Sequence, residues 1–129
     1  MAGTRTPAQL LAAYPEHIRS LAEETRQFVR RALPHVNESA DATAPLLAYI
    51  YAPGYRGMVA TIILSKAGVK LGIVEGARLP DPRSLLEGSG KLHRYVQLKT
   101  AADLRGPGIS ALLTGASRAC RTRLTASPP

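Results

Sequence analysis

A glycine-rich loop beside a lysine offers the most chemistry in this sequence. In the run from Gly88 to Lys91 (Gly-Ser-Gly-Lys), two flexible glycines can turn backbone N–H groups toward an anion, and the lysine adds positive charge. The phosphate-binding loop of nucleotide hydrolases has a glycine where this chain has Leu85 and a hydroxyl residue where it has Leu92. The run therefore predicts anion binding without magnesium-dependent nucleotide hydrolysis.

Arginines and lysines around this loop complete the predicted binding site. Their positive charge suits an anionic ligand or an acidic protein partner. The alternative is that these cations form a solvated rim, which is the more common role of a charge cluster. The residues predicted to bind are Arg78, Arg83, Gly88, Ser89, Gly90, Lys91, Arg94 and Lys99.

No set of residues in the chain predicts catalysis. His17, His35 and His93 lack the spacing of metal ligands, and the sequence pattern around a nucleophilic serine is absent. Asp81 precedes a proline, so we expect it to cap a short helix that ends at Gly88 rather than to act as an acid. The sequence therefore predicts a non-enzymatic binding module without catalytic residues.

The net charge of the chain favours acidic partners in general. Its 17 Lys and Arg outnumber 9 Asp and Glu, giving a net charge of +8 that attracts acidic proteins, phosphorylated ligands and nucleic acid. Sequence-tolerant binding of nucleic acid is a further hypothesis, since Tyr49, Tyr51 and Tyr95 could share a sheet face with Lys99 and stack on bases. The alternatives are that the same tyrosines pack in the core or line a cavity.

Length and composition predict one domain, residues 1–129, with an ordered core over about 8–120 and tails over 1–5 and 125–129. Cys120 is the only cysteine, so no disulfide can form within the chain. No stretch reaches the ~20 apolar residues of a membrane span, and the N-terminus lacks the pattern of a secretory signal. We therefore expect a cytoplasmic protein that does not bind membranes.

Helical patterns at both ends of the chain surround strand patterns in the middle. A short helix can start at Thr6 and Pro7, a longer one is expected over residues 15–32, and the last near Pro107. Gly72 is expected to leave room for a close approach on one sheet face. The strands are expected over residues 46–52, 58–66, 69–75 and 93–99 and part of 35–44.

This order of elements predicts an α+β fold, in which an antiparallel sheet of about five strands has the N- and C-terminal helices packed on one face. The helices then leave the other sheet face uncovered. That face would be the place for a ligand or for the interface of a homodimer.

The run from Val69 to Pro82 resembles the central motif of the YdhG-like family of small bacterial domains. The run from Leu85 to Lys91, the following Arg94 and the helix ending at Leu33-Pro34 extend the resemblance, which covers about residues 8 to 120. The family is largely of unknown function. Its α+β sandwich has been likened to frataxin, so the resemblance implies this fold.

The resemblance also implies an alternative function, iron binding and delivery. Iron bound as a hard ion prefers carboxylate ligands. The nearest approach to an acidic cluster in the sequence is formed by Glu16, Glu23 and Glu24. Arg19 lies between Glu16 and Glu23 on the predicted helix. Iron is therefore expected as a cofactor only through the family resemblance.

Overall fold

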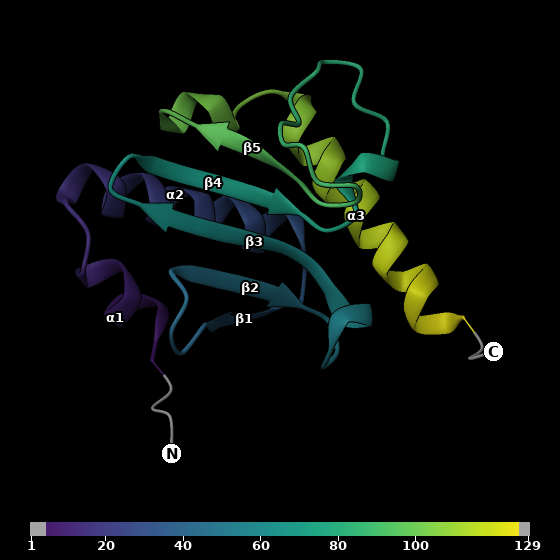
Figure 1. Ribbon diagram of the computed structural model, residues 1–129, viewed down its shortest axis with the longest axis horizontal. Coiled ribbons are helices and arrows are strands. Elements are labelled where there is room, and N and C mark those ends of the chain that lie inside the picture. The colour runs from purple at the N-terminus through teal and green to yellow at the C-terminus, as the bar shows by residue number, and fades with distance from the viewer. Residues whose placement is uncertain (1–4, 127–129) are drawn as a thin grey trace.

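A computed structural model describes residues 5–126 as an α+β fold (Figure 1). Five antiparallel strands form one open sheet in the order β1-β2-β3-β4-β5, so the predicted fold class is confirmed. The strands are β1 (Asn37–Ala40), β2 (Leu46–Ile50), β3 (Met58–Ser65), β4 (Gly68–Ile73) and β5 (Arg94–Leu98). The helices are α1 (Pro7–Ala12), α2 (Glu16–Ala32) and α3 (Pro107–Thr125), with short 3-10 turns η1 (Tyr55–Gly57), η2 (Gly76–Arg78) and η3 (Ala101–Leu104).

The start of α1 follows the predicted capping chemistry. The Thr6 hydroxyl accepts a hydrogen bond from the backbone N–H of Gln9 (3.1 Å), while the Gln9 side chain accepts one from the backbone N–H of Thr6 (2.8 Å). Pro7 occupies the first helical position, where no N–H is needed. In α2, the buried residues recur at helical spacing and form one stripe facing the core. They are Ile18, Leu21, Ala22, Thr25 and Val29.

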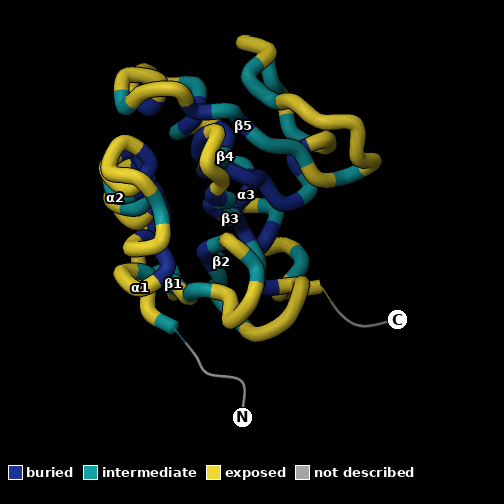
Figure 2. The backbone as a smooth tube through the Cα atoms, turned by 60° about the vertical axis from the view of Figure 1, so that its left-hand side comes forward, coloured by how far each residue is buried: buried dark blue, intermediate teal, exposed yellow. Residues whose placement is uncertain are grey.

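The helices α2 and α3 cover one face of the sheet and leave the other uncovered (Figure 1). On the covered face, direct cross-strand partners such as Leu47, Ile62, Leu71 and Val96 are at most 5% exposed. Figure 2 shows the buried residues concentrated in the central strands of the sheet. No helix within residues 5–126 is both long and apolar enough to cross a bilayer.

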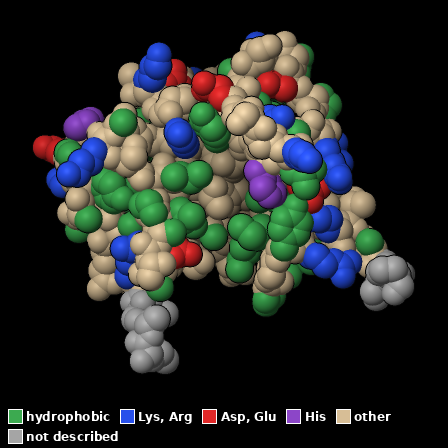
Figure 3. Space-filling model, viewed as in Figure 1, with side chains coloured by type: hydrophobic (Ala, Val, Ile, Leu, Met, Phe, Trp, Pro, Cys, Tyr) green, Lys and Arg blue, Asp and Glu red, His purple; other side chains and the backbone are tan. Residues whose placement is uncertain are grey.

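The uncovered face also carries apolar side chains. Leu46, Ile50, Met58 and Ile63 point to this side of the sheet and are only partly buried. Figure 3 shows hydrophobic side chains gathered across this face, with Lys and Arg around them. This surface therefore combines an apolar centre with charged surroundings.

The loop between β4 and β5 contains a turn instead of the predicted short helix. The carboxylate of Asp81 accepts hydrogen bonds from the backbone N–H groups of Leu85 and Leu86, both at 2.9 Å. Ser84 has a φ of 54°, a left-handed conformation that cannot continue a helix. Asp81 therefore closes a turn through its side chain, and Gly88 adopts its positive φ of 116° with no helix before it.

Two residues of the predicted tails, Arg5 and Thr125, belong to ordered parts of the structure. Residues 1–4 and 127–129 lie outside the described residues. Arg5 pairs with Ala40 at the end of β1, and its guanidinium donates hydrogen bonds to two carbonyl groups of the β1–β2 turn. At the other end of the chain, α3 continues as far as Thr125. Both Arg5 and Thr125 thus belong to the folded part.

Candidate functional site

A pocket of about 270 Å³ opens on the uncovered face, at the end of the sheet where β3 begins and β4 ends. Its walls are mostly apolar, whereas the broader hollow of about 730 Å³, between α2 and the segment from η3 to the start of α3, includes several charged and polar side chains. A concave apolar site with a few polar groups is the usual form of a binding site. The pocket is lined by Tyr55, Met58, Thr61, Ile63, Gly72, Ile73, Val74, His93, Arg94 and Tyr95.

Gly72 and Thr61 form the floor of the pocket. They are direct cross-strand partners, and a Cβ added to Gly72 would lie 2.3 Å from Thr61 Oγ1. The close approach predicted at Gly72 is therefore made by the Thr61 side chain. Because Gly72 has no side chain, the cross-strand row from Ala48 through Thr61 and Gly72 to Tyr95 is lowest at Gly72. This depression gives the pocket its depth.

Tyr55 and Glu75 build a polar wall at the rim of the pocket. The Tyr55 hydroxyl donates to Glu75 Oε2 (2.5 Å), and Arg78 and Arg123 lie 3.3 and 3.8 Å from Oε1 of the same carboxylate. The hydrogen bond from Tyr55 lowers the pKa of Glu75, and the two guanidinium groups lower it further. The same hydrogen bond raises the pKa of Tyr55. Glu75 is therefore ionised at neutral pH, with its charge compensated by neighbouring cations.

The backbone of Glu75 determines which nitrogen of His93 carries the proton. Glu75 has left-handed dihedral angles (φ 55°, ψ 32°), and its backbone N–H lies 3.1 Å from His93 Nδ1. A backbone N–H can only donate, so Nδ1 must accept and the neutral ring must carry its proton on Nε2. The ring of His93 also packs against Tyr55, with centroids 5.9 Å apart. His93 therefore brings a fixed N–H donor to the pocket.

We expect the neutral form of His93 to give the ¹⁵N NMR pattern of the Nε2-protonated tautomer. In the variant Glu75→Gly, the backbone N–H remains and glycine tolerates the positive φ, so the tautomer should persist although the carboxylate is gone. Exposed His17 serves as the internal control and should show the tautomer mixture of a solvated imidazole. An Nδ1-protonated His93 would contradict the hydrogen bond from Glu75.

Comparison with protein-family models, with curated proteins and with solved structures finds no match to this chain. The resemblance to the YdhG-like family stays a prediction.

Arg94 is the predicted binding residue that lines the pocket. Its Nη1 donates a hydrogen bond to the carbonyl oxygen of His93 at 3.1 Å. Gly88 lies beside it, since a Cβ added there would be 3.3 Å from the Tyr95 ring and 3.7 Å from Arg94 Cδ. A Cβ on Gly90 would lie 3.3 Å from the carbonyl oxygen of His93. The structure thus brings the two loop glycines and Arg94 together at the pocket rim.

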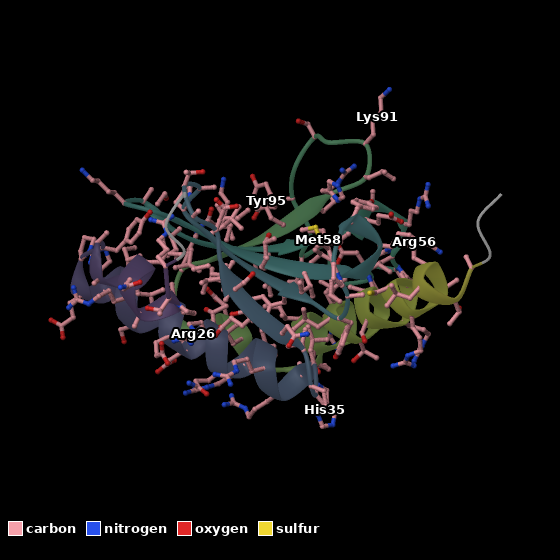
Figure 4. The ribbon with its side chains drawn as sticks, turned by 90° about the horizontal axis from the view of Figure 1, so that it is seen from below. Arg26, His35, Arg56, Met58, Lys91 and Tyr95 are labelled. Atoms are coloured by element: carbon pink, nitrogen blue, oxygen red, sulfur yellow. The ribbon has the colours of Figure 1, made fainter. Side chains whose placement is uncertain are left out.

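The other predicted binding residues are spread over the surface. Arg78 belongs to the polar wall, and Arg83 contacts the start of α3. Ser89 and Lys91 are exposed, and Figure 4 places Lys91 at the outer end of the loop. Lys99 follows the far end of β5, roughly 16 Å from its first residue at the rise of an extended strand. These residues do not form a single contact site with Arg94.

The glutamates of the iron alternative are not assembled into a site. Within residues 5–126, no three His, Cys, Asp or Glu side chains lie close enough together to hold a metal ion. Glu16, Glu23 and Glu24 therefore do not form the expected cluster. Glu23 instead makes an ion pair with Arg26 at 2.7 Å.

The tyrosines predicted as a stacking platform lie on different faces of the sheet. Tyr49 is fully buried on the covered face, whereas Tyr95 lines the pocket on the uncovered face. The Tyr51 hydroxyl donates to the carbonyl oxygen of Pro34 (2.9 Å). The alternative interpretation, core packing, holds for Tyr49.

Sequence reasoning missed most of the pocket. Tyr55, Glu75 and His93 belong to no motif, and they meet because the start of β3, the end of β4 and the start of β5 lie side by side at one end of the strands. The signal in the sequence that points to this site is Gly72, at which a close approach on one sheet face was expected. The strands predicted over residues 58–66 and 69–75 are joined by a short turn, so pairing them would bring Thr61 beside Gly72, whereas Tyr95 follows a long loop that leaves its register open.

Proposed function

We propose that this protein is a non-enzymatic binding module for an amphipathic anion. The apolar group of the ligand enters the pocket on the uncovered sheet face, and its anionic group meets Arg94 and His93. The observation that carries this proposal is the pocket itself, in which an apolar lining is combined with these two donors at the rim.

The dimensions of the pocket support a small apolar group. Its volume of about 270 Å³ is just below the roughly 300–1,000 Å³ of sites for drug-sized ligands. Met58 and Ile63 on β3 and Tyr95 on β5 provide apolar surface on two sides of the glycine floor. A planar ring can lie on such a floor because no side chain rises from Gly72.

The charges at the rim support an anionic group. Arg94 uses Nη1 for the bond to the His93 carbonyl oxygen, and a guanidinium has further N–H groups to offer. His93 adds the Nε2–H that follows from its bond with Glu75. The Glu75 carboxylate does not oppose an anion strongly, since Tyr55 and two arginines already compensate it.

The same geometry favours binding over catalysis. A general base at the pocket would need an accepting atom, but His93 uses Nδ1 for the backbone of Glu75 and has a proton on Nε2. The raised pKa of Tyr55 keeps its hydroxyl protonated. His93 and Arg94 therefore act as donors at this rim, and the Glu75 carboxylate is occupied by the Tyr55 hydroxyl and two arginines.

Binding of 2-naphthoate, an aromatic carboxylate, tests the proposal through ligand-observed NMR and calorimetry. Thr61→Phe should weaken binding about tenfold or more, equal to about 1.4 kcal/mol, because a ring beside Gly72 fills the floor. Ala48→Phe is the matched control, since it puts the same ring in the next position of the same row, outside the pocket. It should bind as the wild type does.

The carboxylate of the probe is tested separately. Arg94→Gln should weaken binding of 2-naphthoate but leave binding of the neutral 2-naphthamide unchanged. Equal binding by Thr61→Phe and Ala48→Phe, or no saturable binding at a Kd of about 1 mM or tighter, would contradict the proposal. Thermal unfolding of each variant confirms that it is folded.

A further inference from the structure

We infer that the amphipathic anion is an acidic amphipathic helix of a partner protein, which lies across the uncovered face and places one apolar side chain in the pocket. The inference rests on the proposed function, because it uses the same pocket and the same donors. It adds to that function the kind of partner that supplies the anion.

Apolar surface continues from the pocket across the sheet. Leu46 and Ile50 on β2 are partly exposed and do not line the pocket. Leu46 is the cross-strand partner of Ile63, and Ile50 is the partner of Met58, so an apolar strip leads from β2 to the pocket. A small molecule confined to the pocket would leave this strip in water. An amphipathic helix would cover both the apolar strip and the pocket, as in helix-in-groove recognition.

The edges of the sheet disfavour a partner strand. On β1, Arg5 pairs with Ala40, and on β5, Glu87 exchanges two backbone hydrogen bonds with Tyr95 at 2.7 and 3.1 Å. An added strand would have to replace these bonds at both positions. A helix satisfies its own backbone and needs only side-chain contacts, so it suits binding on the face.

The charges bordering this face select an acidic partner. Lys70 projects from β4 on the uncovered side, with Nζ 4.4 Å from the centroid of the Tyr95 ring. Figure 4 shows the loop that carries Lys91 rising above the sheet on the side away from the helices. Arg94 adds a third cation at the pocket itself. Two acidic residues lie near this border: Glu87, exposed beside Tyr95, and Glu75, whose charge Arg78 and Arg123 compensate. The cations thus complement glutamates on a helix.

The test uses a fluorescent helical peptide of about 18 residues, or roughly five turns, with Leu, Phe and Leu along one face and Glu on the other. Fluorescence anisotropy should show binding that 2-naphthoate displaces. Lys70→Gln should weaken it about threefold or more, and Glu87→Gln, which keeps the backbone bonds to Tyr95, should strengthen it about twofold, as expected for charge pairs at a rim. A matched peptide with Lys in place of Glu should bind at least tenfold more weakly.

Each other outcome overturns the inference in a distinct way. If 2-naphthoate binds in the pocket but the acidic peptide does not, the partner is wrong and the proposed function stands; if neither binds, both fail. Equal binding of acidic and basic peptides overturns the charge argument. A dimer in sedimentation experiments that Leu46→Glu dissociates would assign the face to a second copy of the chain. Displacement of the peptide by a single-stranded oligonucleotide but not by 2-naphthoate would assign it to nucleic acid.

Discussion

Replacing Glu38 by alanine is expected to lower the free energy of unfolding by about 3–5 kcal/mol, the usual cost of removing one partner of a buried ion pair. Glu38 Oε1 and Oε2 accept hydrogen bonds from Arg26 Nη2 (2.7 Å) and Nε (2.9 Å), and Oε2 also accepts one from the Tyr49 hydroxyl (2.5 Å). The Glu38 and Arg26 side chains are only 9% and 14% exposed. Without the carboxylate, Arg26 Nε and Nη2 and the buried Tyr49 hydroxyl lose their partner together, and Arg26 keeps the exposed Glu23.

Chemical denaturation measures this loss, and Glu23→Ala is the matched control. Glu23 pairs with the same arginine at 2.7 Å, but its side chain is 45% exposed. Its removal should cost about 1 kcal/mol or less, as for other exposed ion pairs. Similar losses for the two variants would show that burial of the pair does not determine its contribution.

The pH dependence of the same pair has a defined sign. Burial alone would raise the pKa of Glu38, but the hydrogen bonds from Arg26 and Tyr49 outweigh it and hold the pKa below the ordinary value of 4.5. A carboxyl whose pKa is lower in the folded state contributes its full stabilisation above the unfolded pKa and loses it as the pH falls through the folded pKa. The difference in stability between the wild type and Glu38→Ala should therefore shrink below about pH 4.5.

Replacing Gly57 by alanine is expected to destabilise the protein by about 3 kcal/mol or more, at the upper end for overpacking. An added Cβ would lie 2.0 Å from the carbonyl oxygen of Ala52 and 2.6 Å from its carbonyl carbon, which are backbone atoms. The backbone between β2 and β3 would have to move, including the hydrogen bond from Tyr51 N–H to the Gly57 carbonyl (2.8 Å). Tyr55 lies in the same turn, so the polar wall of the pocket would shift with it.

Thermal unfolding and 2-naphthoate binding measure these two consequences, with Gly115→Ala as the control. A Cβ at Gly115 in α3 would lie 3.4 Å from a methyl group of Leu79, which is ordinary contact. Alanine is favoured over glycine inside a helix by about 1 kcal/mol, so this variant should keep or gain stability and keep its ligand. Equal effects at the two glycines would mean that the contact at Ala52 does not constrain the turn.

Local sequence patterns determine most of this fold, so most of its helices and strands could be predicted from the sequence. The buried stripe of α2, with Ile18, Leu21 and Val29, follows from helical spacing, and Thr6 with Pro7 marks the start of α1. The strands were recognisable because apolar residues fill β3 and alternate along β4. The prediction of a short helix after Asp81 was wrong because an aspartate at this position can also close a turn. The left-handed conformation of Ser84, which excludes the helix, has no signature in the sequence.

The pocket depends on contacts between distant residues, which explains why sequence reasoning named Gly72, Arg94 and Tyr95 separately without joining them in one site. Tyr55 and Glu75 are 20 residues apart, and Glu75 and His93 are 18 apart. Their meeting requires the register of two hairpins and the conformation of a long loop. Charge clustering grouped Arg83 and Lys99 with Arg94, but the structure places Arg83 at the start of α3 and Lys99 beyond the far end of β5, because nearness in sequence around a loop does not bring side chains together in space.

The strand order of the sheet has a consequence for how the protein forms. Each strand pairs with the strand next to it in the chain, so most of the sheet can assemble by successive closure of short hairpins, as in folds of low contact order that fold quickly. The long connection lies between β4 and β5, and β5 contributes Tyr95 while α3 contributes Arg123 beside Glu75. During synthesis from the N-terminus, the first four strands can pair before the pocket has its last wall, so the pocket is complete only when the C-terminal third of the chain has folded.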